Sequence, residues 1–119
     1  MNVSIKSDVI KWHIKKHIKK MMLNKVRPTI QINKDKENTS YQLYHSSYRS
    51  VDWNKPENHS ENLYQDIVSC ETEYPDKFIN LIGYSSYNGN EYIADFYLIK
   101  NPHKQINFMY YLNYTLEYF

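Results

Sequence analysis

The hydrophobic positions near the amino terminus recur at the spacing of an amphipathic helix. Between Ser7 and Lys25, apolar side chains fall three or four residues apart, and lysines fill most of the other positions. The apolar stripe consists of Ile10, Ile14, Ile18, Met21 and Met22. Because Ser and Asp are favoured helix N-caps, we expect Ser7 or Asp8 to begin this helix.

A second helical pattern leads directly into a strand. Its apolar face, within a helix expected over residues 60–72, consists of Leu63, Tyr64, Ile67 and Val68. Pro75 ends this helix, because proline lacks an amide proton and disfavours helical angles at the preceding residue. The run from Phe78 to Tyr84 is rich in β-forming residues and predicts a core strand.

Alternating segments between the two helices predict an antiparallel hairpin. Thr29–Asn33 alternates, is followed by a polar turn, and the alternation resumes over Ser40–Tyr48. Residues 49–60 then read as a loop that contains Pro56.

The carboxyl-terminal part predicts further strands. Asn88-Gly89 is the strongest hairpin signal in the chain, and the return strand is expected over Glu91–Lys100. In the tail, apolar side chains occupy every second position, which favours a long strand with one buried face. These positions are Ile106, Phe108, Tyr110, Leu112, Tyr114, Leu116 and Tyr118. A helix over residues 105–118 is the competing interpretation.

This order of elements predicts an α+β fold. Two helices on one face of a four-stranded antiparallel sheet would bury both apolar stripes, and the tail would add a C-terminal strand extension. The 119 residues, 41% of them hydrophobic, suffice for one domain over residues 1–119. Within it, we expect residues 1–6 to be a flexible start and 103–119 to be the extension.

Composition narrows the class of protein. The net charge of +2 is too small to indicate a nucleic-acid partner by itself. The single cysteine, Cys70, excludes an internal disulfide framework and fits an intracellular, reducing compartment. No segment has the apolar length of a membrane span or the hydrophobic region of a signal peptide, so no membrane contact is expected.

The sequence carries no recognisable catalytic or metal motif. His13 and His17 stand four residues apart, as in half of a metal site, but no glutamate follows His13 as metalloproteases require. No P-loop, Rossmann glycine run, nucleophile elbow or paired-carboxylate site is present. Thirteen tyrosines invite a covalent-tyrosine nuclease, yet the His-hydrophobic-His motif of such enzymes is missing. We therefore predict no catalytic residue, cofactor or metal ligand.

The lysines of the first helix form a basic face, opposed within that helix only by Asp8. Its central members are Lys15, Lys16, Lys19 and Lys20. Such a face could bind a nucleic acid or an acidic host protein, as in a small virus- or mobile-element-encoded binding protein. The plainer interpretation is a core-packed helix whose lysines are solvated.

Four segments carry a resemblance to a known family. They are residues 13–21 (HIKKHIKKM), 26–32 (VRPTIQI), 63–84 (LYQDIVSCETEYPDKFINLIGY) and 95–102 (DFYLIKNP). Over residues 10–102, their order and spacing resemble the small subunit of ribulose bisphosphate carboxylase (Rubisco). In that family the first helix commonly reads QIxxQIxxM. The second carries VLxEVxxCxxxYP before a strand that ends in GF or GY, and the last strand reads SFIxxRP.

The resemblance implies a non-catalytic protein that binds by its surface. In the family, the chemistry and the magnesium site belong to the large subunit, and small subunits cap and bridge an octameric core. The implied partner is therefore the Rubisco large subunit, within an oligomeric complex. The implied location is a plastid, the bacterial cytoplasm or a carboxysome.

The chain departs from the family where small subunits contact large subunits. The family strand YWxMWxLP is replaced by Tyr41–Tyr48, which keeps one tyrosine and loses both tryptophans and the proline, and the central-helix glutamate is shifted to Asp66. The candidate contact residues are Tyr41, Leu43, Tyr44, His45, Arg49 and Trp53. Trp53 could instead be a core residue. Three alternatives stay open: a divergent small subunit, a small-subunit-like adaptor, or a protein that shares only the fold.

Overall fold

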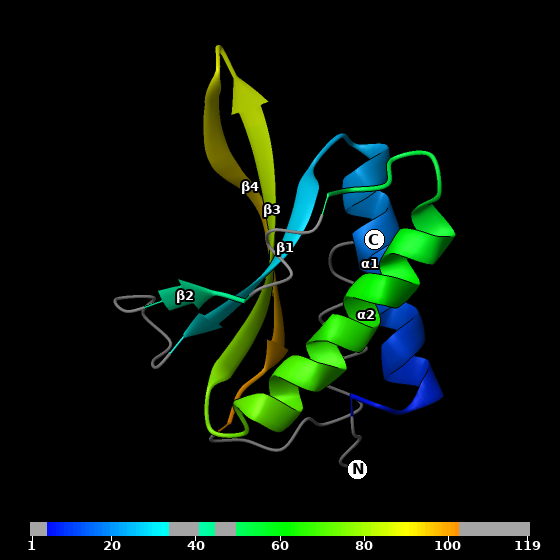
Figure 1. The fold of residues 1–119 in the computed structure, drawn as a ribbon, viewed down its shortest axis with the longest axis vertical. Coiled ribbons are helices and arrows are strands. Elements are labelled where there is room, and N and C mark those ends of the chain that lie inside the picture. Colours follow the sequence, from blue (N-terminus) through cyan, green and yellow to red (C-terminus); the bar gives the residue numbers. More distant parts are fainter. Residues whose placement is uncertain (1–4, 34–40, 45–49, 103–119) are drawn as a thin grey trace.

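The computed structural model describes residues 5–33, 41–44 and 50–102, and shows an antiparallel sheet with two helices on one face (Figure 1). In chain order the elements are α1 (Asp8–Leu23), β1 (Arg27–Asn33), β2 (Tyr41–Leu43), α2 (Pro56–Glu73), β3 (Phe78–Tyr87) and β4 (Asn90–Lys100). The α+β class is therefore confirmed. The predicted tail strand and the family strand beyond Tyr44 lie outside the described residues.

The sheet has the order β2-β1-β3-β4, and every neighbouring pair is antiparallel. Three of its strands are long, whereas β2 is a three-residue strand at one edge. β1 and β3 lie in the centre and pair from Arg27–Tyr84 to Asn33–Phe78. β1 and β2, and likewise β3 and β4, are consecutive in the chain and adjacent in the sheet, as is usual for short connections.

The first helix forms where its sequence pattern predicts. The Ser7 side chain accepts a hydrogen bond from the Ile10 amide at 3.3 Å, which supplies the N-cap. At the other end, the Asn24 amide donates to the Lys20 carbonyl, and Lys25 adopts a positive φ of 61°. All members of the predicted apolar stripe are buried.

The second helix begins earlier than the sequence predicts. We expected a loop up to residue 60, but α2 starts at Pro56 itself. Proline is well tolerated in the first turn of a helix, where its missing amide proton would have no partner. The end of the helix is as predicted, with Glu73 as its last residue ahead of Pro75.

The two central strands are buried on both faces. Toward the helices, register places Ile30 opposite Leu81 and Ile32 opposite Ile79, and these residues join the core with the helical stripes. On the other face, Gln31 lies opposite Asn80, whose side-chain amide donates to the Gln31 carbonyl oxygen at 3.4 Å. This bond pairs two polar groups of the buried face, where an unpaired amide would be costly.

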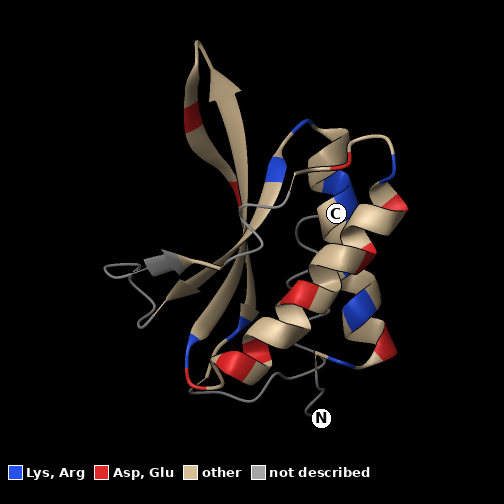
Figure 2. Cartoon of the chain, in the orientation of Figure 1, with Lys and Arg blue, Asp and Glu red and all other residues tan. Residues whose placement is uncertain are grey.

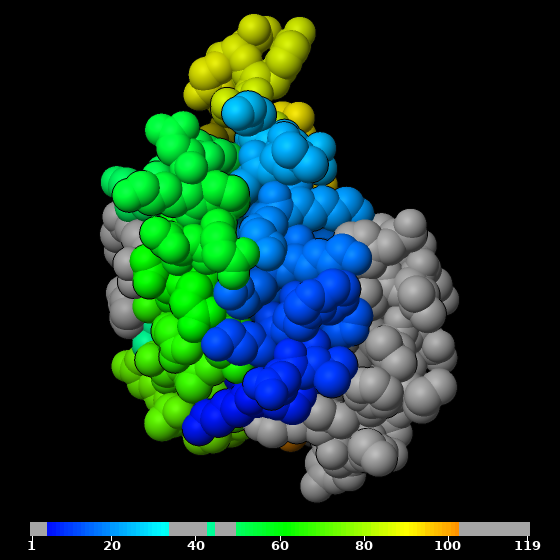
Figure 3. Space-filling model, turned by 90° about the vertical axis from the view of Figure 1, so that its right-hand side faces the viewer, coloured from blue at the N-terminus to red at the C-terminus, as the bar shows by residue number. Residues whose placement is uncertain are grey.

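The β3–β4 hairpin is closed by the predicted Asn-Gly turn. Asn88 and Gly89 have φ values of 51° and 81°, as a type I′ turn requires at both central positions. Because β1 pairs with β3 only as far as Tyr84, the outer part of the hairpin extends beyond the sheet, where Figures 1 and 3 show it projecting. None of the helices described is long and apolar enough to cross a membrane.

Gly83 is required where α1, β1 and β3 approach one another. A Cβ there would clash with Val26 Cγ1 and would lie 3.1 Å from Asp95 Cβ and 3.3 Å from Met21 Sδ. We expect Gly83→Ala to lower the free energy of unfolding by about 1–3 kcal/mol, measured by urea denaturation.

The matched control for this prediction is Val26→Ala, which removes the clashing methyl group. The double variant should lose less stability than the sum of the single variants, by more than about 0.5 kcal/mol. Strict additivity would show that the Val26 contact does not explain the glycine.

Candidate partner-binding surface

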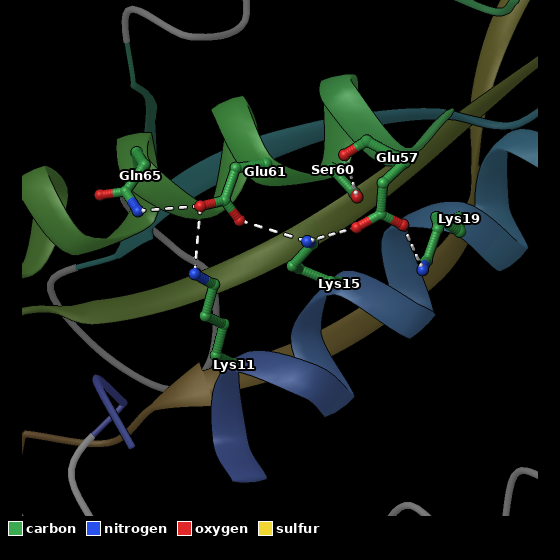
Figure 4. Close-up of polar contacts among 7 residues, drawn as sticks. All are labelled: Lys11, Lys15, Lys19, Glu57, Ser60, Glu61 and Gln65. Atoms are coloured by element: carbon green, nitrogen blue, oxygen red, sulfur yellow. Dashed lines mark hydrogen bonds and ion pairs between the residues drawn. The ribbon is translucent and has the colours of Figure 1, made fainter. Parts of the chain in front are cut away.

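The lysines of α1 are largely paired with glutamates of α2. Lys15 Nζ lies 2.6 Å from Glu57 Oε1 and 3.2 Å from Glu61 Oε2. Lys19 adds a contact of 2.8 Å to Glu57, and Lys11 one of 3.1 Å to Glu61 (Figure 4). These five side chains form a lysine–glutamate seam between the helices, and Figure 2 shows acidic residues of α2 along the side that faces α1.

The seam adds two carboxylates of α2 to Asp8, the one acidic residue within the basic helix. The hydrogen bond of Lys15 and then that of Lys19 lower the pKa of Glu57 to about 2, and the hydrogen bond with Glu57 raises the pKa of Lys15. Glu57 is largely exposed, so screening by solvent keeps each pair weak. Their effect is to align two helices rather than to present a free cationic face.

The other lysines of the predicted basic face are also engaged. Lys16 Nζ lies 4.7 Å from the centroid of the exposed Trp12 ring, in cation–π geometry. Lys20 lies near enough to Asp95 to lower the pKa of that carboxyl group slightly. The structure therefore lends no support to a nucleic-acid surface on this helix.

The residues of the segment expected to contact a partner differ in how deeply they are buried. Tyr44 lies on the helix side, where it is buried, and its hydroxyl donates to Glu73 Oε2 at 2.8 Å. Burial first, and then this hydrogen bond, raise the pKa of its hydroxyl. Tyr44 therefore holds β2 against α2 and is not available to a partner. Leu43 pairs with Gln31, so it projects from the face away from the helices and is half-buried.

Of the remaining strand candidates, Tyr41 belongs to β2 and pairs with Asn33. His45 and Arg49 lie outside the described residues.

The segment of residues 50–55 presents Trp53 at the surface. The Asp52 amide donates to His59 Nδ1 at 3.5 Å, and the Lys55 amide donates to the Asp52 carbonyl at 3.1 Å. Val51 packs against the core, whereas Trp53 is exposed. The segment is thus held by one bond to α2 and by one bond within itself. Trp53 is a surface residue here and not a core residue, which removes the alternative that we left open.

A histidine–carboxylate pair, not predicted from sequence, joins α1 to β4. His17 Nε2 lies 3.0 Å from Asp95 Oδ2, and the buried His17 ring packs on Tyr97 with centroids 4.3 Å apart. Burial raises the pKa of Asp95, but the hydrogen bond and charge of His17 outweigh it and lower the pKa overall. Residues separated by 78 positions have no local pattern that reveals such a pair.

The described residues contain no group of three or more His, Cys, Asp or Glu side chains that could hold a metal ion. Burial, and then Glu73, raise the pKa of the Cys70 thiol to about 12, so this thiol is not an activated nucleophile.

The sequence did not reveal a group of exposed large apolar side chains on the β3–β4 hairpin. This group consists of Tyr87, Tyr92, Ile93 and Phe96. One signal was available, because residues 84–92 read YSSYNGNEY, a composition typical of protein-binding loops.

Comparisons with known proteins relate this geometry to a known fold. No family model matches the sequence, and neither does any curated protein. Among solved structures, a chain of the structure titled Rubisco from Galdieria partita matches with a TM-score of 0.62 at 18% identity. The match covers 87% of this chain and 76% of the other, so the matched chain is little longer than this one. The resemblance to the Rubisco small subunit is therefore confirmed at the level of the fold, with divergent sequence.

The seam predicts a specific dependence of stability on pH. The folded-state pKa of Glu57 lies below its ordinary value of 4.5, so the stabilisation is present above about pH 4.5 and disappears as pH falls toward 2. The difference in free energy of unfolding between the wild type and Glu57→Gln should shrink over this range and also shrink at about 1 M salt.

The matched control is Glu71→Gln, which changes a glutamate of α2 outside the seam and is compared with the wild type in the same way. Urea denaturation at several pH values measures both differences. An equal pH response of the two variants would contradict the role of the seam.

Proposed function

We propose that this chain is a non-catalytic, small-subunit-like protein that binds Rubisco large subunits and stabilises or organises their assembly in carbon fixation. The single observation that supports this most is the shared fold with a Rubisco chain over 87% of the present chain. A plastid or a bacterial cell would be its location. The proposal goes beyond the fold likeness, because one fold can serve many functions.

The distribution of polar groups agrees with a binding role. Lys15, Glu57 and Glu61 join the two helices, the His17–Asp95 pair joins α1 to β4, and the Cys70 thiol is buried in the core. These groups maintain the fold, so the surface is left to recognise the partner. No residue is assigned a catalytic role.

The proposed contacts are Trp53, beside the start of α2, and Leu43, on the face of β2 that points away from the helices. Tryptophan is among the residue types that contribute most to protein interfaces, and the short segment around Trp53 is held by backbone hydrogen bonds. A segment whose backbone is already ordered loses less entropy on binding. Tyr41, His45 and Arg49 remain candidates on the same grounds as before, whereas Tyr44 is withdrawn because it is buried.

A direct test is native mass spectrometry with a form I large-subunit core stripped of its small subunits. We expect a stoichiometric complex, and we expect Trp53→Ala to weaken it by about tenfold or more. The matched control is Trp12→Ala, which changes an exposed tryptophan outside the proposed surface. Absence of any association between the wild type and large-subunit cores would refute the proposal.

The same measurement with complete Rubisco separates two forms of the proposal. A true small subunit occupies the sites of the resident small subunits, so it should bind only to vacated cores. An adaptor should bind the complete enzyme as well. Light scattering of the pure protein, alone and with each form of Rubisco, would report the same distinction in solution.

A further inference from the structure

The outer part of the β3–β4 hairpin, residues 84–93, forms an arm that neither α1 nor α2 accompanies. It starts where β1 stops pairing with β3, at the Arg27–Tyr84 pair, and it projects from the body of the molecule (Figures 1 and 3). A register shift between Gly83 and Tyr84 marks its base. Such irregularities increase strand twist and redirect the strands that follow.

Exposed apolar side chains occupy both faces of the hairpin. Tyr92 pairs with Ser85 and lies on the helix side of the strand, as does Tyr87, and their exposed fractions are 53% and 72%. Ile93 pairs with Tyr84 on the opposite side, and Phe96, at the base of the arm, pairs with Ile82 there. Ile93 and Phe96 are 50% and 48% exposed. A hairpin in contact with a single flat surface would need apolar residues on one face only.

The arm carries almost no net charge of its own. Its one charged residue, Glu91, is bound by Arg27 at 2.9 Å, and the Arg27 guanidinium lies 5.0 Å from the Tyr84 ring centroid. The other residues of the arm are Tyr, Ser, Asn and Gly, with one Ile. Interface centres are depleted of charge and enriched in aromatic residues, and binding loops favour Tyr, Ser, Gly and Asn. A nucleic acid or an anionic membrane would require an excess of cations.

We propose that the arm inserts between two neighbouring subunits of the oligomeric core to which the chain binds; this rests on the function proposed above. The two apolar faces would each contact one subunit. The tip, which carries no charged residue, would fit an uncharged crevice between them. The type I′ turn and the Arg27–Glu91 pair hold the arm in shape before binding, which reduces the entropy lost on association. The partner is thus a folded protein assembly with a neutral cleft.

The test compares variants of each face in their binding to the large-subunit core. Tyr87→Ser combined with Tyr92→Ser alters one face, Ile93→Thr combined with Phe96→Thr alters the other, and Leu23→Ser is the control at an exposed site in α1. We expect each arm variant to raise the dissociation constant about tenfold or more and the control to leave it unchanged. Urea denaturation of each variant confirms that it is folded.

Hydrogen exchange provides a readout that needs no variant. In the wild-type complex, amides of residues 84–93 should exchange more slowly than in the free protein. Unchanged exchange in the arm, or normal binding by both arm variants, would overturn the inference while leaving the proposed function intact. Loss of binding on one face only would overturn the insertion geometry.

Two further outcomes identify other occupants. If the wild type does not bind the core, the proposed function fails and this inference fails with it. If sedimentation shows that the pure protein self-associates and that the arm variants abolish this, the arm binds a second copy of the chain, which also overturns the proposal.

Discussion

The pairing of β1 with β3 is the interaction on which the rest of the structure depends. These strands are buried on both faces, and their register places Ile30 and Ile32 beneath the helices while Gln31 meets Asn80 on the far side. The helical stripes pack against this pair together with Tyr97 and Ile99 of β4, and β2 and β4 add at its two edges. Because β3 continues beyond the last pair with β1, the same register also creates the projecting arm.

Charge in this molecule acts mainly within the fold. Three lysines of α1 meet Glu57 and Glu61 across the helix interface, and His17 meets Asp95 between α1 and β4. A helix face that is basic in the sequence of α1 thus becomes part of the lysine–glutamate seam once α2 packs beside it. Weak exposed pairs of this kind add little stability individually, but they favour one relative position of the helices.

The proposed contacts lie in parts of the chain that the core does not use. The loop that carries Trp53 is held at the start of α2, and the β3–β4 arm is held by its turn and by the Arg27–Glu91 pair. Both present apolar side chains on ordered backbone, which reduces the entropy lost on binding. The likeness to a Rubisco chain covers 87% of this chain and concerns the fold.

Sequence alone determined what depends on near neighbours in the chain. The stripe and the Ser7 cap of α1, the end of α2 before Pro75 and the Asn88-Gly89 turn follow from local spacing and backbone preferences, and the fold class follows from their order. The start of α2 was missed because Pro56 suits a loop and a first helical turn equally.

Only the tertiary structure decided which distant residues meet. Lys15 and Glu57 are 42 positions apart, and Tyr44 and Glu73 are 29 apart, so neither pairing leaves a periodic signal. For the same reason, sequence could not show that Tyr44 is buried, that Trp53 is exposed, or that the arm extends beyond β1. Those outcomes depend on sheet register and helix packing, which the whole chain sets together.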